Sequence, residues 1–255
     1  MNLLRSFAIA MAMYSKIPMP KVDWNEKNMK YAMCFFPFVG VLIGVLIYLL
    51  GNLMLASSCG RLFFSVVMTW IPLFVTGGIH MDGFMDTMDA LHSYGEREKK
   101  LEILKDPHAG AFAMIGIGGY LMLSAALWSE VTVQMLPVIA MGYVLSRTLS
   151  AYSVVTFPAA KSSGLARTFQ DGAQKSKVRI VMLVYLLLVG VGMVSVGRTQ
   201  GIITFAAAIL IFVYYRWMSM KQFGGITGDL AGYFLQLCEI GILVSMILTG
   251  GVLWN

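Results

Sequence analysis

The sequence predicts an all-α protein, a polytopic integral membrane bundle of about seven transmembrane helices with a cytoplasmic N-terminus. Hydrophobic residues make up 58% of the 255 residues, and the mean hydropathy is +0.75. Charged residues make up only 13%, about half of the usual share in globular proteins. These charges are clustered, so the remaining apolar runs of about 20 residues match the thickness of a bilayer core. We interpret residues 1–255 as a single membrane domain.

The chain begins with a predicted short helix in residues 1–20, which ends at Ile17-Pro18-Met19-Pro20. This helix is too short to cross a bilayer comfortably and is predicted to be interfacial or re-entrant. In the first span, Gly40 and Gly44 have the spacing of small residues that lets helices pack closely. The seven predicted spans cover residues 31–55, 62–79, 109–128, 133–157, 178–196, 202–218 and 230–252.

The basic residues predict the orientation. If the N-terminus is cytoplasmic, sixteen of the 19 Lys and Arg residues lie on the cytoplasmic side, Arg61 and Arg198 lie on the other side, and Arg147 lies inside a span. Cytoplasmic loops of membrane proteins carry such an excess of basic residues. We therefore expect a multi-pass protein of the cytoplasmic (inner) membrane. The net charge of +6 follows from this loop asymmetry, so we expect a lipid bilayer and no nucleic acid as partner.

Three aspartates, Asp82, Asp86 and Asp89, lie within eight residues after the second predicted span. At about 100° per residue, they share one narrow face of a helix. Carboxylates this close raise one another's pKa unless a cation neutralises them. Mg²⁺, or alternatively Mn²⁺, prefers oxygen ligands and often bridges to substrate phosphates. The pattern predicts a metal site on these three aspartates; the alternative is a solvated helix face.

Further polar motifs are expected on the same side of the membrane. The motifs placed at cytoplasmic ends of spans are the aspartate motif, Lys105-Asp106, Arg167 to Asp171, and Thr227-Gly228-Asp229. Acids that hold a metal, together with cations that neutralise a leaving phosphate, suit phosphoryl chemistry. Lys or Arg side chains in these motifs are expected to neutralise the charge that develops on the leaving phosphate.

Several of these residues have two interpretations. Gly78 either lets backbone approach a phosphate or simply makes a turn. Asp229 either binds the metal or favours the dipole of a last helix that Thr227 caps. His80 is expected to hydrogen-bond to an aspartate, because no HxxxH or cysteine pair supports a zinc site. Arg147 must pair with an acid, a phosphate or backbone carbonyls, or else snorkel.

Together these motifs resemble the cobalamin synthase family, the adenosylcobinamide-GDP ribazoletransferases. In family order they are Ile17–Pro20, Phe36–Gly40, His80–Asp89, Leu101–Asp106, Gly110, Ser146–Arg147, Gly164–Leu165 and Gly225–Asp229. The resemblance covers nearly the whole chain. The chain departs from the family pattern at Ala90, at Pro107–Ala111 and at Lys161, and the second of these weakens a phosphate-binding role for residues 107–111.

The resemblance implies the reaction. A hydroxyl of α-ribazole, or of its 5′-phosphate, attacks the cobinamide-side phosphorus of adenosylcobinamide-GDP, and GMP leaves as adenosylcobalamin or its 5′-phosphate forms. The expected catalytic residues are Asp82, Asp86, Asp89, Lys105 and Asp106, and one of these carboxylates takes the hydroxyl proton. The expected substrate-binding residues are Gly78, His80, Arg147, Arg167 and Asp229. The active site is expected to open to the cytoplasm, and a homo-oligomer is compatible with the sequence.

Three rival functions use related features. A CDP-alcohol phosphotransferase has an aspartate-rich membrane helix, but this chain lacks the DG-x₂-AR segment and the longer aspartate spacing. A membrane prenyltransferase needs a second acidic motif, and here the last acidic element holds only Asp229, with Glu239 ten residues on. An ion transporter would need acids in the middle of its spans to pass the ion along, whereas here the acids gather at one membrane face.

Overall fold

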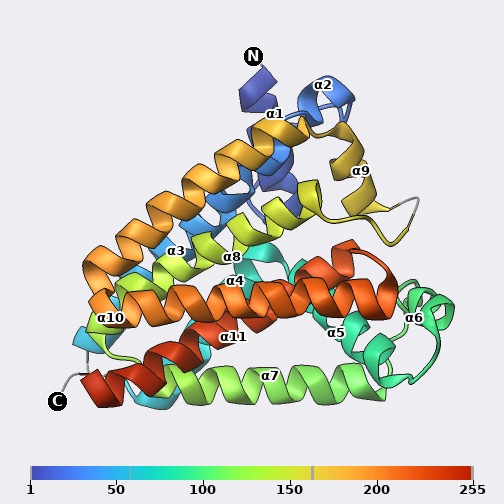
Figure 1. Ribbon diagram of the computed structural model, residues 1–255. Coiled ribbons are helices and arrows are strands. Elements are labelled where there is room, and N and C mark those ends of the chain that lie inside the picture. Colours follow the sequence, from blue (N-terminus) through green and yellow to red (C-terminus); the bar gives the residue numbers. More distant parts are fainter. Residues whose placement is uncertain (1, 58, 162–163, 254–255) are drawn as a thin grey trace.

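The computed structural model describes residues 2–57, 59–161 and 164–253, which fold as α-helices joined by short loops (Figure 1). The helices are α1 (Asn2–Tyr14), α2 (Glu26–Met29), α3 (Ala32–Ala56), α4 (Arg61–Thr76), α5 (Ile79–His92), α6 (Arg97–Ile103), α7 (Ala111–Ser129), α8 (Leu136–Thr156), α9 (Leu165–Gly172), α10 (Lys175–Phe223) and α11 (Gly228–Leu253). A short 3₁₀ turn, Val133–Met135, precedes α8. The described residues contain no β-strand, and one isolated parallel bridge joins Ala159 to Ile226.

The apolar helices agree with the predicted membrane spans. Within the described residues, five helices are long and apolar enough to cross a membrane, and a sixth crossing results if the bent pair α4–α5 forms one span. One of the five is α10, which has 49 residues and would be about 73 Å long if straight, more than twice the thickness of a bilayer core. The two legs of α10 correspond to the fifth and sixth predicted spans. Counted as two crossings, they raise the total from six to the seven spans that the sequence predicts.

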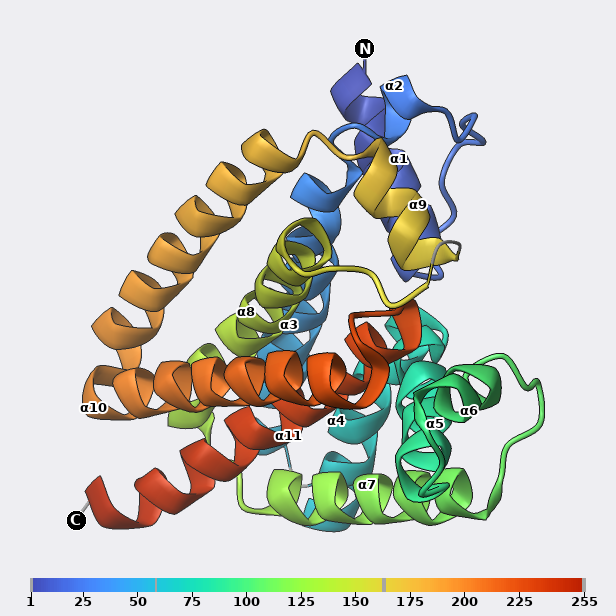
Figure 2. The same ribbon diagram turned by 45° about the vertical axis from the view of Figure 1, so that its right-hand side comes forward.

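The break in α10 lies at Arg198, whose φ of 45° and ψ of −123° are not helical. Figure 2 shows the two legs meeting at a sharp angle at the left of the molecule. The sequence predicts a tight turn at Gly197-Arg198, and the structure confirms it. The legs expose large apolar side chains, among them Ile180, Leu187 and Leu210, as expected for helices that face lipid.

The centre of the bundle is formed by α8 and α11, which are buried along most of their length. Helix α3 packs closely against α8 through the predicted glycine pair. A Cβ atom on Gly40 would lie 2.3 Å from the carbonyl oxygen of Tyr143, and one on Gly44 would lie 2.5 Å from that of Ala140. The backbones of α3 and α8 therefore touch, which confirms that this spacing serves close packing.

This contact yields a stability prediction. Gly40→Ala should destabilise the protein by about 1–3 kcal/mol. The added methyl group would overlap with the backbone of α8, which cannot change rotamer as a side chain can. The matched control is Gly118→Ala in α7, where a Cβ atom would meet no described atom within 4 Å. The control should be neutral or slightly stabilising, since alanine is the better helix former. Unfolding in mixed detergent micelles measures both, and equal effects would show that the α3–α8 contact is not tight.

A bend of 98° separates α4 from α5. Gly77 and Gly78 make it, with left-handed φ angles of 66° and 81° that residues with a Cβ atom adopt at a cost. The sequence predicts one span running into the aspartate motif, whereas the structure turns the chain sharply between the two. As a result α5 does not continue the direction of α4 and packs mainly against α7 and α11.

The bend, the α10–α11 turn and the start of α7 lie on the right of the molecule in both ribbon views, opposite the break in α10 (Figures 1 and 2). The polar motifs of the sequence therefore gather on one side, as the predicted topology requires.

Candidate active site

The first feature of the site is the contact between α5 and α11. A Cβ atom on Gly83 would lie 2.7 Å from the carbonyl oxygen of Asp229, and one on Gly232 would lie 2.8 Å from that of His80. Larger residues at either glycine would push the helices apart. The glycines thus bring the start of α11, with Asp229, against the face of α5 that carries Asp82 and Asp86.

The loop after α8 joins this contact through a short stretch of paired backbone. Ala160 N–H donates to the carbonyl of Ile226 at 2.9 Å, and Ile226 N–H donates to that of Pro158 at 2.9 Å. The next residue, Lys161, lies within electrostatic range of both Asp229 and Asp86. Partial burial lowers the pKa of Lys161, with Lys105 acting in the same direction, while Asp229 and Asp86 act against it.

Carboxylates from two helices thus form one acidic cluster, which we define as Asp82, Asp86 and Asp229. Asp82, Asp229 and Asp89 all lie within electrostatic range of Asp86, and Asp82 is also within range of Asp229. Asp89 is left out of the defined cluster because its carboxylate also binds the start of α7. The cation Lys161 offsets part of this charge at Asp86. Such a group of carboxylates repels itself, and a bound cation would stabilise it.

Asp89 has a different environment from its two predicted partners. Its carboxylate accepts hydrogen bonds from Gly110 N–H at 2.6 Å and from Ala113 N–H at 2.8 Å. These amides begin α7, whose first N–H groups have no partner within their own helix. Asp89 therefore caps α7 from outside, and both of its oxygens take part. Asp89 lies on the same helix as Asp82 and Asp86, as predicted, but its carboxylate already accepts two hydrogen bonds from the start of α7.

A cavity of about 330 Å³ opens beside the acidic cluster. One end is charged and at least partly exposed, and is lined by Asp82, Lys161, Arg167 and Asp229. The other end is apolar and mostly buried, and is lined by Tyr14, Met33, Phe36, His80, Ser150, Val154 and Leu235. The cavity therefore joins charged side chains to a largely apolar, buried lining.

His80 lies in the buried end, not beside the aspartates. Its ring is only 5% exposed and packs against the rings of Tyr14 and Phe36, at 6.0 Å and 5.8 Å between centroids. Within the described residues, its Nε2 atom has no hydrogen-bond partner. The expected hydrogen bond from His80 to an aspartate is therefore wrong, because the ring points among aromatic side chains of α1 and α3.

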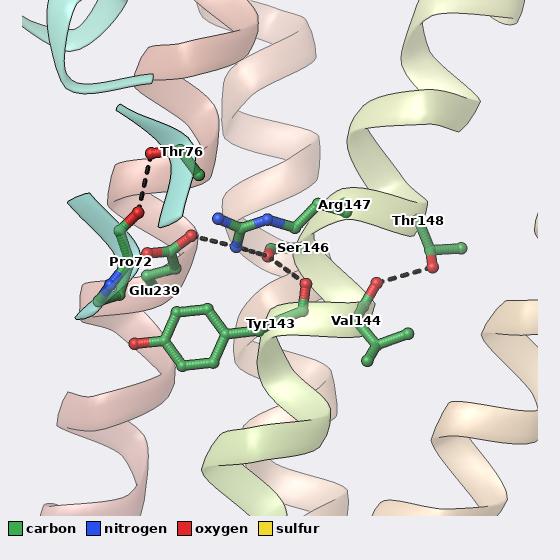
Figure 3. Close-up of polar contacts among 8 residues, drawn as sticks. All are labelled: Pro72, Thr76, Tyr143, Val144, Ser146, Arg147, Thr148 and Glu239. Carbon is green, nitrogen blue, oxygen red and sulfur yellow. Dashed lines mark hydrogen bonds and ion pairs between the residues drawn. The ribbon is translucent and has the colours of Figure 1, made fainter. Parts of the chain in front are cut away.

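Arg147 pairs with an acid, one of the alternatives that the sequence left open. Its Nη1 atom donates to Oε1 of Glu239 on α11 and to Ser146 Oγ, the latter at 3.0 Å (Figure 3). The side chains of Arg147 and Glu239 are 0% and 4% exposed. Arg147 is not among the residues that line the cavity. The structure thus places Arg147 in a buried ion pair between α8 and α11, outside the lining of the cavity.

The remaining predicted cations and Asp106 lie nearer the surface. Arg167 lines the cavity, and its Nε donates to Asp171 at 2.7 Å. Lys105 is exposed and does not line the cavity, although it lies within range of Lys161. Asp106 accepts from His108 N–H at 3.0 Å, and this bond, followed by one from the His108 ring, lowers the pKa of Asp106. Such a carboxylate is a weak base.

Two structural interpretations from the sequence are confirmed. Gly78 is the left-handed residue that begins α5 and is not among the residues lining the cavity, so it makes the turn. Thr227 Oγ1 accepts from Leu230 N–H at 3.2 Å, as a residue that caps α11 does, and donates to Asp229 Oδ2 at 3.2 Å. Capping does not exclude Asp229 from the site, because its carboxylate also lies within electrostatic range of Lys161 and Asp82.

Four residues that line the cavity were not among the predicted site residues: Tyr14, Ser150, Lys161 and Gly164. Of these, Gly164 and Lys161 appear in the comparison with the family pattern, but without a role in the site. Lys161 was one of five basic residues in a loop, with nothing in its spacing to single it out. It becomes special only because the 158–160 segment pairs with the α10–α11 turn, a contact between distant parts of the chain. Tyr14 ends a helix whose apolar pattern resembles that of any interfacial segment.

The ligand atoms that the acidic cluster offers can be compared with those that a metal ion prefers. Among the described residues, no group of three or more His, Cys, Asp or Glu side chains is arranged to hold a metal ion. Mg²⁺, however, keeps several waters and is usually bound by one or two carboxylates together with substrate phosphates. Asp82, Asp86 and Asp229 supply oxygen ligands of this kind, so the residues present fit a metal that binds with its substrate.

Comparison with known proteins gives a consistent result. A family model described as cobalamin-5-phosphate synthase matches residues 6–247. An adenosylcobinamide-GDP ribazoletransferase of Lachnoclostridium phytofermentans is 44% identical over 253 residues, 99% of this chain and 97% of the relative. Proteins of the same name from Clostridium perfringens and Treponema denticola are 31% and 33% identical, over 96% and 94% of this chain and 98% and 96% of theirs.

No solved structure shows significant similarity to the chain. The sequence relatives nevertheless cover nearly its whole length, and they confirm the family that the motifs resemble. The chain belongs to the cobalamin-5-phosphate synthase family.

Proposed function

We propose that this protein is an adenosylcobinamide-GDP ribazoletransferase. It transfers the cobinamide-phosphate group of adenosylcobinamide-GDP to α-ribazole or its 5′-phosphate and releases GMP. The observation that carries the proposal is a cavity lined by Asp82, Asp229 and Lys161 together with buried apolar side chains. Asp86 does not line this cavity but lies within electrostatic range of all three charged residues. A pyrophosphate fits the charged part of the lining and an organic group fits the apolar part.

The acidic cluster is proposed to hold Mg²⁺, or Mn²⁺, together with the pyrophosphate of the donor. A bound divalent ion supplies a positive charge that polarises the phosphoryl oxygens. Asp82, Asp86 and Asp229 are the ligands we propose, with Asp89 holding α5 against α7 instead.

The chain's own side chains have distinct tasks in this proposal. Lys161 neutralises charge that grows on the departing phosphate, and it replaces Lys105 in that role because Lys161 lines the cavity. Arg167, at the same charged end, binds the acceptor's phosphate when one is present. The hydroxyl proton goes to a carboxylate oxygen of the acidic cluster rather than to Asp106, whose hydrogen bonds favour its ionised form.

Substrate dependence tests the function directly. Purified protein with Mg²⁺ should release GMP only when both adenosylcobinamide-GDP and α-ribazole, or its phosphate, are present. Release of CMP from a CDP-alcohol, with no reaction on the corrinoid, would instead assign the protein to lipid head-group synthesis.

We further propose that the protein lies in the inner membrane and that its site opens to the cytoplasm. The reason is the excess of Lys and Arg in the loops on the side of the site. Impermeant thiol reagents applied to intact cells should label cysteines introduced at Glu130 and Arg198, and should spare Arg97→Cys and Asp171→Cys. The two groups of positions lie at opposite ends of the spans, so each controls for the other. Labelling at position 97 before lysis would reverse the orientation.

A further inference from the structure

Two segments that are far apart in the chain bring lysines together away from the cavity. Gln174 N–H, just before α10, donates to the carbonyl of Lys30 at 3.0 Å, and the Tyr31 hydroxyl donates to Gln174 Oε1 at 2.8 Å. Helix α2 and the start of α10 therefore meet, near the top of the molecule in both ribbon views (Figures 1 and 2). We call the exposed lysines of these two segments the basic patch: Lys27, Lys30, Lys175 and Lys177.

Two ammonium groups of the basic patch approach the same aromatic ring. Lys30 Nζ lies 5.7 Å and Lys177 Nζ lies 5.9 Å from the centre of the Tyr31 ring. The ring attracts each cation weakly, but the two like charges repel one another. Within the described residues, no lysine of the basic patch forms an ion pair, although Asp23 and Glu26 lie in the same segment as Lys30. An anion from outside the chain would stabilise this arrangement.

The surface next to the basic patch indicates where such an anion comes from. Arg179 is the last cation of this part of α10, and the exposed side chains of the following turns, Ile180, Leu183 and Leu187, are apolar. Helix α10 is also long and apolar enough to cross a membrane. A change from basic to exposed apolar side chains marks the level at which a spanning helix leaves the hydrocarbon core. Lipid headgroups lie at that level, so their phosphates are within reach of the basic patch.

We propose that the basic patch binds the headgroup phosphate of an anionic phospholipid of the phosphatidylglycerol type. The phosphate lies between the ammonium groups of Lys30 and Lys177, and the acyl chains lie along the exposed apolar face of α10. The proposal is independent of the proposed function, since no lysine of the basic patch lines the cavity.

Charge and surface together favour an anionic lipid over other ligands. A zwitterionic headgroup carries its own cation, which the lysines repel, whereas basic clusters beside a spanning helix attract anionic lipids. A soluble phosphate has the required charge but no chains to cover Ile180 and Leu183. A soluble acidic protein would contact the lysines, but the lipid-facing surface begins within one turn of Lys177.

Thermal unfolding of the full-length protein in uncharged maltoside micelles tests the proposal, because a ligand that binds only the folded protein raises its unfolding temperature. Phosphatidylglycerol should stabilise the protein at lower concentration than phosphatidylcholine with the same acyl chains. Lys177→Gln should raise the phosphatidylglycerol concentration for half of the effect about fivefold, and Lys30→Gln with Lys177→Gln about 25-fold. Lys30→Arg with Lys177→Arg keeps both charges and should behave like the wild type.

The matched control is Lys99→Gln, which removes the same charge from an exposed side chain of α6 outside the basic patch and should bind phosphatidylglycerol like the wild type. Equal effects of the two lipids, or equal weakening in Lys99→Gln and Lys177→Gln, would overturn the proposal. Stabilisation by glycerol phosphate, which lacks acyl chains, would replace the lipid site with a site for soluble anions. Unchanged lipid binding in the double glutamine variant would leave the lysines to another partner, such as an acidic protein.

Salt provides a test that needs no variant. Raising the ionic strength from about 0.1 M to 1 M shortens the Debye length from about 10 Å to about 3 Å. The difference between phosphatidylglycerol and phosphatidylcholine should then disappear in the wild-type protein. A preference for phosphatidylglycerol that is unchanged at 1 M salt would show that charge does not select the lipid, and would also overturn the proposal.

Discussion

Asp86→Asn is expected to reduce turnover by about 10³-fold, because metal-assisted charge stabilisation is worth several kcal/mol and each 1.36 kcal/mol is tenfold in rate. The amide keeps the shape of the side chain but removes one charge from the acidic cluster. Asp82 and Asp229 are both within electrostatic range of position 86, so the loss of that charge relieves repulsion in the metal-free protein. The variant should therefore unfold no more easily than the wild type.

The measurements are GMP release at saturating substrates and thermal unfolding, each over a range of Mg²⁺ concentrations. Asp82→Asn and Asp229→Asn should behave in the same way as Asp86→Asn. Asp23→Asn is the matched control, since Asp23 is an exposed aspartate that does not line the cavity and lies outside the proposed metal site. Near-normal turnover in a protein with all three cluster positions changed would rule out the acidic cluster as the catalytic metal site.

Asp89 should differ from these three positions. Asp89→Ala removes two hydrogen bonds to the start of α7, which should destabilise the protein by about 1–2 kcal/mol, as the loss of a helix cap does. Once folded, the variant should keep its dependence on Mg²⁺ concentration, with turnover reduced less than in Asp86→Asn. A shift in the Mg²⁺ requirement as large as that of Asp86→Asn would return Asp89 to the metal site.

The contrast between Asp86 and Asp89 shows what the sequence could and could not predict. Helical periodicity correctly placed Asp82, Asp86 and Asp89 on one helix, because residue spacing alone determines which side chains share a face. It could not say which other helix approaches each of them. The start of α7 meets Asp89 and the start of α11 meets Asp86, and these contacts join segments that are far apart in the chain.

The apolar helices were predicted well for a similar reason. Membrane spans depend on the length and composition of a local segment, which the sequence displays directly. The bend at Gly77-Gly78 was harder, since a glycine pair serves equally as a turn, a packing site or an approach to phosphate. Arg147 was recognised as needing a partner, but Glu239 lies 92 residues further on, and only packing of α8 on α11 identifies it.

That pair leads to the second large effect. Replacing either Arg147 or Glu239 alone, by Met or Gln respectively, should destabilise the protein by about 3–5 kcal/mol, because each change leaves its partner's charge buried and unpaired. Both side chains lie within membrane-spanning helices and are almost entirely buried. Three of their polar atoms, Arg147 Nε, Arg147 Nη2 and Glu239 Oε2, already have no partner among the described residues. The other hydrogen bond of Arg147 is to the neutral Ser146 hydroxyl, which cannot replace the charge of Glu239.

The double variant Arg147→Met with Glu239→Leu distinguishes a structural ion pair from a substrate-binding arginine. Apolar residues of similar volume can replace a buried pair with little change in stability or even a gain, so the double variant should be far more stable than the sum of the single changes implies. Unfolding in mixed micelles gives this coupling energy. Because Arg147 does not line the cavity, GMP release by the double variant should return to within about tenfold of the wild type, a window of roughly 1.4 kcal/mol. Restored stability with turnover still abolished would mean that Arg147 contacts a substrate in the working enzyme.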